Sequence, residues 1–267
     1  MLVRPAAVDG LFYPATSGAL RARVADYLAV VAEIRDHADT AHAPKLLIVP
    51  HAGYEYSGAV AANAYALVSP PRASIVKRVV MLGPSHRVAL RGLAVPAVDA
   101  FETPLGHIAL DAAALASIEG LPQVVRSDRA HEREHSLEVQ LPFLQVQLGS
   151  FTLVPLVVGD AGAAEVAQVI ERLWGGAETL IVVSSDLSHY LPYEQASVID
   201  RATAQRIVGF DASLSPDEAC GATAINGALL AARRQRLAPR LLDLRNSGDT
   251  AGSRDRVVGY CSVAFEQ

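Results

Sequence analysis

Three histidines and one aspartate of this chain follow closely after strongly apolar segments. His51 ends the stretch LLIVPH, His86 ends VVMLGPSH, and Asp186 and His189 lie in LIVVSSDLSH. Apolar runs of this kind are typical of buried strands, and in α/β sheets ligands gather beyond the carboxyl ends of the strands. A single histidine after a strand is most often an ordinary loop residue. Because the arrangement occurs three times, we expect these side chains to converge on one edge of a sheet.

Neutral imidazoles together with a carboxylate or a thiolate are the donors that borderline metals prefer. Two histidines and one anionic ligand with open positions suit non-haem Fe(II), and zinc or copper fit the same donors. Cys220 precedes Gly221 at the start of an expected helix, where the helix dipole lowers the pKa of a thiol and makes thiolate available. The other cysteine, Cys261, lies in the apolar segment VVGYCSVAF and is interpreted as a small buried residue.

A second group of titratable residues lies in HEREHSLEVQLP, residues 131–142, with His131, Glu134, His135 and Glu138. This spacing is not the HExxH motif of zinc proteases, and glutamates at a helix start also suit the helix dipole. We expect one of these residues, with His135 and Glu134 as the candidates, to line the pocket as an acid/base group or as a partner of a ligand. The remaining histidines fall in expected loops and are assigned to the surface: His37, His42 and His107.

Other common catalytic motifs are missing from the sequence. There is no GxSxG nucleophile elbow, no GxxxxGK[ST] phosphate-binding loop and no GxGxxG dinucleotide fingerprint. The serines at 184–185 with Asp186 and His189 imitate a hydrolytic triad, but triads are usually assembled from distant segments. A metal-dependent hydrolase stays open as a further alternative.

Composition limits the class of protein. The chain has 267 residues, 51% of them hydrophobic, which is enough for one sizeable α/β domain, with two small domains as the alternative. The net charge is −5 without any Lys/Arg-rich run, so nucleic acid and anionic membrane surfaces are not expected as main partners. No apolar stretch is long enough to span a bilayer, and MLVRPAAVDGLFYP does not read as a signal peptide. We therefore expect a cytoplasmic protein.

Apolar strands alternate with helical patterns along the chain, which predicts a parallel or mixed sheet covered on both faces. Strands are expected at 45–50, 76–82, 93–98, 151–159, 179–186, 240–247 and 256–266. Helices are expected at 17–36, 57–68, 136–149, 161–176 and 194–210, and from Ala222 onward. The segment 38–44 is expected to be a linker and 69–74 a loop. Pro96 favours a place near the sheet edge for its strand, and Pro142 is expected to kink or restart its helix.

Several motifs in this order resemble the Memo family: DGLFYPA, PHAGYEYSG, LGPSHR, FETPLG, EHSLEVQLPFL, VPLVVG, SSDLSHY, CG before a helix, and a closing VVGY. The resemblance runs from about residue 4 to residue 265, and we treat residues 1–267 as a single Memo-like domain. It implies the fold of class III extradiol dioxygenases, an α/β fold with one mixed or parallel central sheet and helices on both faces.

The resemblance also implies a site. The family metal would be held by His51, His86 and Cys220, with Asp186 and His189 lining the same pocket. The family metal is thought to be iron, which implies Fe(II), with copper also discussed. Related dioxygenases have a glutamate where this family has the cysteine, and a thiolate is softer and more easily oxidised than a carboxylate.

Two classes of function are compatible with this resemblance. One is dioxygenase-like or other redox chemistry on an unknown small molecule, with Asp186, His189, His135 and Glu134 as acid/base or supporting groups. The other is a non-enzymatic metal carrier or a partner-binding scaffold that reuses the fold, because fold does not fix function. Microbial members of the family often accompany a radical-SAM protein and a third small protein, the AmmeMemoRadiSam system, which implies these two as partners.

Overall fold

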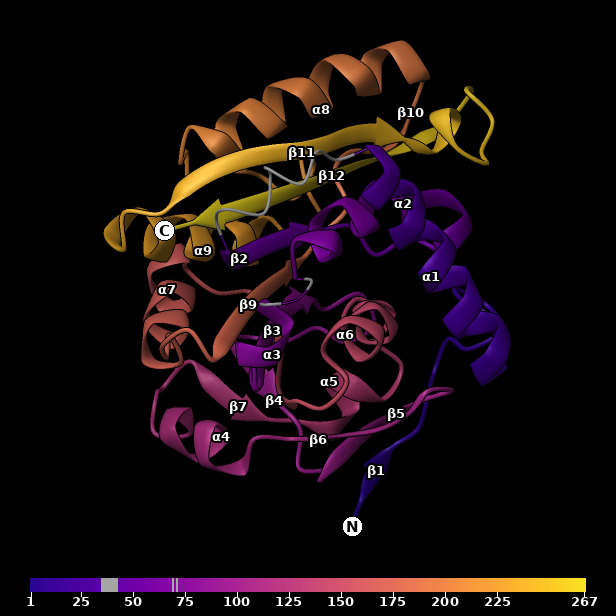
Figure 1. Cartoon of the computed structure of the whole chain (residues 1–267). Coiled ribbons are helices and arrows are strands. Elements are labelled where there is room, and N and C mark those ends of the chain that lie inside the picture. The colour runs from indigo at the N-terminus through magenta and orange to yellow at the C-terminus, as the bar shows by residue number, and fades with distance from the viewer. Residues whose placement is uncertain (35–42, 69, 71) are drawn as a thin grey trace.

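The computed structural model describes residues 1–34, 43–68, 70 and 72–267 (Figure 1). The end of the helix predicted for 17–36 and most of the linker predicted for 38–44 lie outside these residues. His37 and His42, which were assigned to the surface, also lie outside them.

Four parallel strands form the centre of a nine-stranded sheet in the described residues. β9 lies between β2 and β3, and β8 lies on the far side of β3. The segments predicted as strands before His51, His86 and Asp186 are therefore neighbours that run in one direction, which confirms that expectation. The bounds of the four strands are Pro44–Val49 for β2, Arg78–Pro84 for β3, Thr152–Val158 for β8 and Thr179–Ser184 for β9.

Antiparallel pairings on both sides make the sheet mixed. β12 is antiparallel to β2, β10 and β11, while β4 is antiparallel to β8 and parallel to β7. β4 ends before Pro96 and is next to the terminal strand β7, as the proline predicts. The bounds of these strands are Leu93–Val95 for β4, Val124–Arg126 for β7, His189–Leu191 for β10, Ala238–Asn246 for β11 and Val257–Glu266 for β12.

Helices cover both faces of this sheet (Figure 1), so the predicted α/β class is confirmed. Alternate residues of a strand point to opposite faces, and Leu46 and Ile48 accordingly join the core under α7 and α9. Leu47 and Val49 join the other core, under α1, α2 and α6, while α8 packs along β11 and β12. The bounds of these helices are Ser17–Ile34 for α1, Tyr54–Tyr65 for α2, Leu141–Leu148 for α6, Ala163–Arg172 for α7, Tyr193–Val208 for α8 and Ala222–Arg234 for α9.

Short elements were not predicted, because two to seven residues carry too little periodicity to be recognised. A second sheet joins β1 (Val3–Arg4), β5 (Ala100–Thr103) and β6 (Gly106–Ala109). The predicted loop at 69–74 contains α3 (Arg72–Ile75), although residues 69 and 71 lie outside the described part of the chain. Pro142 stands in the first turn of α6 after a 3₁₀ turn at Glu138–Gln140, so the proline restarts the helix. Two further short helices are α4 (Ala112–Ile118) and α5 (Asp128–Glu132).

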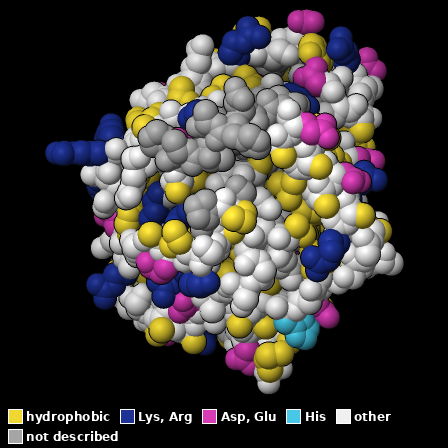
Figure 2. All heavy atoms as spheres, viewed as in Figure 1, with side chains coloured by type: hydrophobic (Ala, Val, Ile, Leu, Met, Phe, Trp, Pro, Cys, Tyr) yellow, Lys and Arg dark blue, Asp and Glu magenta, His cyan; other side chains and the backbone are white. Residues whose placement is uncertain are grey.

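The distribution of charge on the surface agrees with the absence of a Lys/Arg-rich run in the sequence. Positive and negative side chains are interspersed over the face drawn in Figure 2, without one large basic patch. Among the described residues, no helix has the length and apolar character needed to cross a membrane.

Glu138 is a buried carboxylate that ties the N-terminal segment to the rest of the fold. It forms an ion pair with Arg4, and the exposed fractions of the two side chains are 0% and 4%. The main-chain amides of Ala7 and Val8 donate to it at 2.9 and 3.1 Å, and the hydroxyl of Tyr13 donates as well. Arg4 also donates to two carbonyl oxygens of the segment that carries Glu138, at 2.8 and 2.7 Å. Glu138, weighed above as a residue of the pocket group, is therefore part of a structural anchor.

Replacing Glu138 with glutamine is expected to lower the free energy of unfolding by about 3–5 kcal/mol, because it leaves the Arg4 guanidinium buried without a counter-charge. Urea denaturation measures this change. The control is Glu119→Gln, whose ion pair with Arg126 is exposed and should be worth less than about 1 kcal/mol. Equal effects of the two substitutions would contradict the anchor.

Candidate metal site

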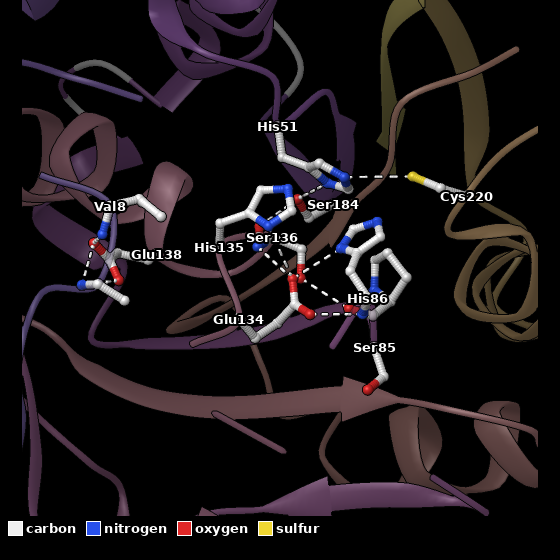
Figure 3. A network of polar contacts seen from close by, with 12 residues as sticks. Val8, His51, Ser85, His86, Glu134, His135, Ser136, Glu138, Ser184 and Cys220 are labelled. Carbon is white, nitrogen blue, oxygen red and sulfur yellow. Dashed lines mark hydrogen bonds and ion pairs between the residues drawn. The ribbon is translucent and has the colours of Figure 1, made fainter. Parts of the chain in front are cut away.

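His51, His86 and Cys220 bring one ligand atom each to a common point (Figure 3). These atoms all lie within 4.8 Å of one another. His51 follows β2, His86 follows β3 and Cys220 precedes α9, so three distant segments meet here. The sulfur of Cys220 is 3.3 Å from Nε2 of His51, and the two imidazole rings are 5.2 Å apart between centroids. The structure shows the predicted convergence, while the bound metal stays a prediction.

Glu134 holds both the ring and the main chain of His86. One carboxylate oxygen accepts from the His86 amide at 2.6 Å, and the other lies 2.9 Å from Nδ1 of the ring. Burial raises the pKa of the Glu134 carboxyl, but hydrogen bonds from His86 and from the Ser136 amide outweigh burial and lower this pKa to about 2. Because an ionised carboxylate can only accept, Nδ1 of His86 carries a proton, and in the neutral form of this ring the lone pair is on Nε2.

His51 is almost fully buried, with an exposed fraction of 2%. Its amide donates to Oδ1 of Asp186 at 2.7 Å, and its ring Nδ1 lies 2.9 Å from the hydroxyl oxygen of Ser184. Burial and the neighbouring His135 and His86 hold the pKa of His51 well below its usual range. The ring is therefore neutral at pH 7, as a metal ligand must be.

The environment of Cys220 corrects one prediction. The amide of Asp186 donates to the Cys220 sulfur at 3.3 Å, which favours thiolate, yet burial raises the pKa of the thiol to about 12, and the Asp186 charge adds to this. The lowered thiol pKa expected from the start of α9 is therefore wrong, because desolvation outweighs the helix dipole. Without a bound cation the thiol is protonated at pH 7.

Gly221 allows Cys220 to approach the end of β9. A Cβ at position 221 would lie 2.7 Å from Cβ of Ser185 and 2.9 Å from the carbonyl oxygen of Ser184. The Gly221 amide donates to the Ser185 hydroxyl at 2.9 Å. Only glycine permits this close packing, which accounts for the CG pair in the sequence.

His135 forms one side of the cluster (Figure 3). Its ring stacks on that of His86 with centroids 4.7 Å apart, stands nearly perpendicular to that of His51, and contacts Phe12 on another side. Burial lowers the pKa of His135 to about 4. Its Nδ1 lies 3.4 Å from a Glu134 oxygen and has no hydrogen-bond partner among the described residues. The structure thus places both predicted residues of this segment, Glu134 and His135, beside the ligand atoms.

Asp186 and His189 lie at different depths. Asp186 is buried beside His51 and Cys220, and burial raises the pKa of its carboxyl to about 7. His189 begins β10, is half-buried, and has a pKa lowered from its usual value mainly by burial. It contributes no atom to the two potential ligand groups found among the described residues. A hydrogen bond connects the loop between Asp186 and His189 to helix α8: the Ser188 amide donates to Asp200 of α8 at 3.0 Å.

Two other histidines lie away from the cluster. His131 is buried in α5, and its Nε2 donates to the carbonyl oxygen of Ala94 at 2.9 Å. Although His131 and His135 are four residues apart, the chain leaves α5 between them, and the His131 ring contacts Phe101 while the His135 ring contacts His51 and His86. His107 is exposed, as expected, but it lies in strand β6 and not in a loop.

Ser184, Ser136 and Gln140 touch the site and were not identified from the sequence as its parts. The Ser184 hydroxyl donates to the carbonyl oxygen of Ser136 at 2.6 Å, and Nε2 of Gln140 donates to Ser184 at 2.8 Å. Because its proton is engaged by a main-chain carbonyl, Ser184 is not activated as a nucleophile, which argues against a hydrolytic triad. The usable signal was the presence of uncharged polar residues inside an apolar strand and an apolar helix.

A cavity of about 440 Å³ adjoins the cluster. Its wall includes Cys220 together with Pro84 and Ser85, the two residues before His86, and Thr223 of α9. This volume falls within the range of small-molecule binding sites.

Comparisons with known proteins agree with this architecture. The family model described as Memo-like protein matches residues 4–264. A MEMO1 family protein of Aquifex aeolicus is 36% identical over 279 residues, which cover 99% of this chain and all of that protein. MEMO1 family proteins of Thermoplasma volcanium and Methanopyrus kandleri are 31% and 32% identical, with 98% and 99% of both chains covered. The chain therefore belongs to the Memo family.

Proposed function

We propose that this protein binds one transition-metal ion through Nε2 of His51, Nε2 of His86 and Sγ of Cys220. Fe(II) is the metal we favour, with copper or zinc as alternatives, and the activity is dioxygenase-like or other oxidative chemistry on a small molecule. One observation carries this proposal. Three ligand atoms from three distant segments lie within 4.8 Å of one another.

The residues present fit such a metal. The pKa values of His51 and His135 are lowered by burial, so neutral imidazole nitrogens surround the point where the ligand atoms meet. Glu134 fixes the protonated nitrogen of His86 in the way that carboxylates orient histidine ligands of metals. Two imidazoles and a thiolate suit iron, copper or zinc, and three protein ligands leave positions open for a substrate.

Side chains beside the proposed metal, His135 and Asp186, would accept and release protons during the reaction. A bound redox metal would supply electron transfer to oxygen and Lewis acidity. The His135 side chain is partly exposed, and because burial lowers its pKa to about 4 its ring is neutral at pH 7 and can accept a proton from a substrate hydroxyl. Asp186, with a pKa of about 7, can hold or release a proton at neutral pH.

The cavity supports an enzyme over a metal carrier or a scaffold. It has room for a small molecule and reaches Cys220, whereas a carrier needs only to enclose its ion. From the family resemblance we also propose a radical-SAM protein and a third small protein as partners. We place the protein in the cytoplasm, where its two free cysteines stay reduced.

Metal analysis tests the ligand set directly. Protein purified without oxygen and reconstituted with Fe(II) is expected to hold about one equivalent of metal, because a three-ligand site binds one ion. Each of His51→Ala, His86→Ala and Cys220→Ala is expected to hold less than about a tenth of an equivalent. His107→Ala is the matched control, since His107 is exposed and lies outside the cluster. A wild-type metal content below a tenth of an equivalent would refute the proposal.

Nitric oxide binding separates the enzyme from the carrier. The reduced, iron-loaded protein is expected to bind nitric oxide with a new signal in electron paramagnetic resonance, because three protein ligands leave positions open. The zinc-loaded protein is the control and should give no signal. An iron-loaded protein that binds no nitric oxide has a saturated site and would favour the carrier.

The thiol of Cys220 is expected to react slowly in the metal-free protein. Only the thiolate is alkylated, and the pKa of about 12 keeps the thiolate fraction small at pH 8. The rate of alkylation by iodoacetamide should therefore keep rising from pH 7 to above pH 9, where an ordinary thiol levels off. Cys220→Ser gives the background from Cys261. A plateau near pH 8 would contradict the buried, protonated thiol.

A further inference from the structure

A chain of buried hydrogen bonds leads from α2 to the ring of His51. The hydroxyl of Tyr65 lies 2.8 Å from Oε1 of Gln140, and Nε2 of Gln140 lies 2.8 Å from the hydroxyl oxygen of Ser184. That oxygen lies 2.9 Å from Nδ1 of His51. Tyr65, Gln140 and Ser184 are all completely buried, so their hydrogen bonds must be satisfied by protein groups.

The amide of Gln140 has only one consistent orientation. Besides Ser184, its Nε2 contacts the carbonyl oxygen of Pro50 at 2.8 Å, and that oxygen can only accept. If the amide were rotated, its oxygen would face this carbonyl and a hydrogen bond would be lost. Nε2 therefore donates to both Pro50 and Ser184, and Oε1 accepts from Tyr65.

The hydroxyl of Ser184 then determines where the proton of His51 lies. Its single proton is donated to the carbonyl oxygen of Ser136 at 2.6 Å, since that carbonyl cannot donate. Its oxygen accepts from Gln140, so no proton is left to donate to His51. The contact at 2.9 Å must therefore be a hydrogen bond from Nδ1–H of His51 to Ser184.

We propose that Ser184, Gln140 and Tyr65 are positioning residues that keep His51 in the Nδ1–H tautomer, with the lone pair of Nε2 directed at Cys220. This deepens the proposed function and rests on it for the metal, but the tautomer itself is a property of the metal-free protein. A histidine ligand oriented in this way meets the metal without a tautomer exchange. His51 and His86 are thus oriented by different partners, an uncharged hydroxyl and a carboxylate.

Nuclear magnetic resonance of the ¹⁵N-labelled, metal-free protein tests the tautomer. In long-range ¹H–¹⁵N spectra the protonated and bare ring nitrogens of a neutral histidine are well separated, and His51→Ala assigns the signals. We expect His51 to carry its proton on Nδ1. A His51 with its proton on Nε2 would overturn the proposal, whatever the protein does with metals.

Variants test the role of the chain of bonds. Ser184→Ala is expected to mix the two tautomers of His51 and to weaken Fe(II) binding about 10–100-fold, the usual cost of removing a partner of a metal ligand. Tyr65→Phe leaves Oε1 of Gln140 without its donor while Pro50 still holds Nε2, and it should weaken binding by about tenfold or less. Ser262→Ala is the matched control, because Ser262 is equally buried in the same sheet and its hydroxyl has no partner among the described residues.

The outcomes separate this proposal from the proposed function. If the wild-type protein binds no metal but His51 shows the Nδ1–H tautomer, which Ser184→Ala disturbs, the metal function fails and the positioning role stands. If Ser184→Ala keeps both the tautomer and the Fe(II) affinity of Ser262→Ala, the positioning role fails while the metal function stands. Thermal denaturation identifies any variant that does not fold, and if Ser184→Ala does not fold, the tautomer of His51 in the wild-type protein decides the proposal.

Discussion

The parallel pairing of β9 with β2 on one side and β3 on the other is the constraint on which the site depends. Val49 pairs with Ser184, so the residues two positions further along, His51 and Asp186, are also level. The 2.7 Å hydrogen bond from the His51 amide to the Asp186 carboxylate follows from this register. A slip by one residue would exchange the faces of the strand and remove the ring from the cluster. His51 and His86 are therefore positioned by main-chain hydrogen bonds of the buried strands that precede them.

One segment connects this sheet edge to the rest of the protein. Alternate residues from Glu134 to Gln140 serve different elements. Glu134 contacts the ring of His86, and Glu138 forms the ion pair with Arg4 that anchors the N-terminal segment. The carbonyl of Ser136 accepts a hydrogen bond from Ser184, and Gln140 donates one to Ser184. This explains why so many polar groups are buried within seven residues. The polar groups of Glu134, Ser136, Glu138 and Gln140 are paired, and this pairing joins the stability of the fold to the geometry of the site.

The sequence predicts those parts of the site that depend on long, regular elements. The apolar segments before His51 and His86 predict two buried strands, and therefore predict that both histidines lie at one edge of the sheet. Gly221 indicates where helix α9 begins. The sequence does not predict that Gln140 and Ser184 meet, because a polar residue inside an apolar segment shows that a partner is needed but not which residue is the partner. The pKa of Cys220 was mispredicted for the same reason, since the burial that raises it comes from three-dimensional packing and outweighs the effect of the adjacent helix.

The two histidines of the cluster differ in burial as well as in their partners. His51 is buried, and its ring contacts the hydroxyl of Ser184. The side chain of His86 is 27% exposed, and its ring contacts the carboxylate of Glu134. An exposed ring competes with water for its hydrogen bonds, so a charged acceptor is needed to keep it oriented. A buried ring has no competing water, so a neutral acceptor is enough to keep it oriented. The adjoining cavity is lined by Cys220 and by the two residues before His86 but not by His51, so the cluster is open on the His86 side and His51 forms its buried floor.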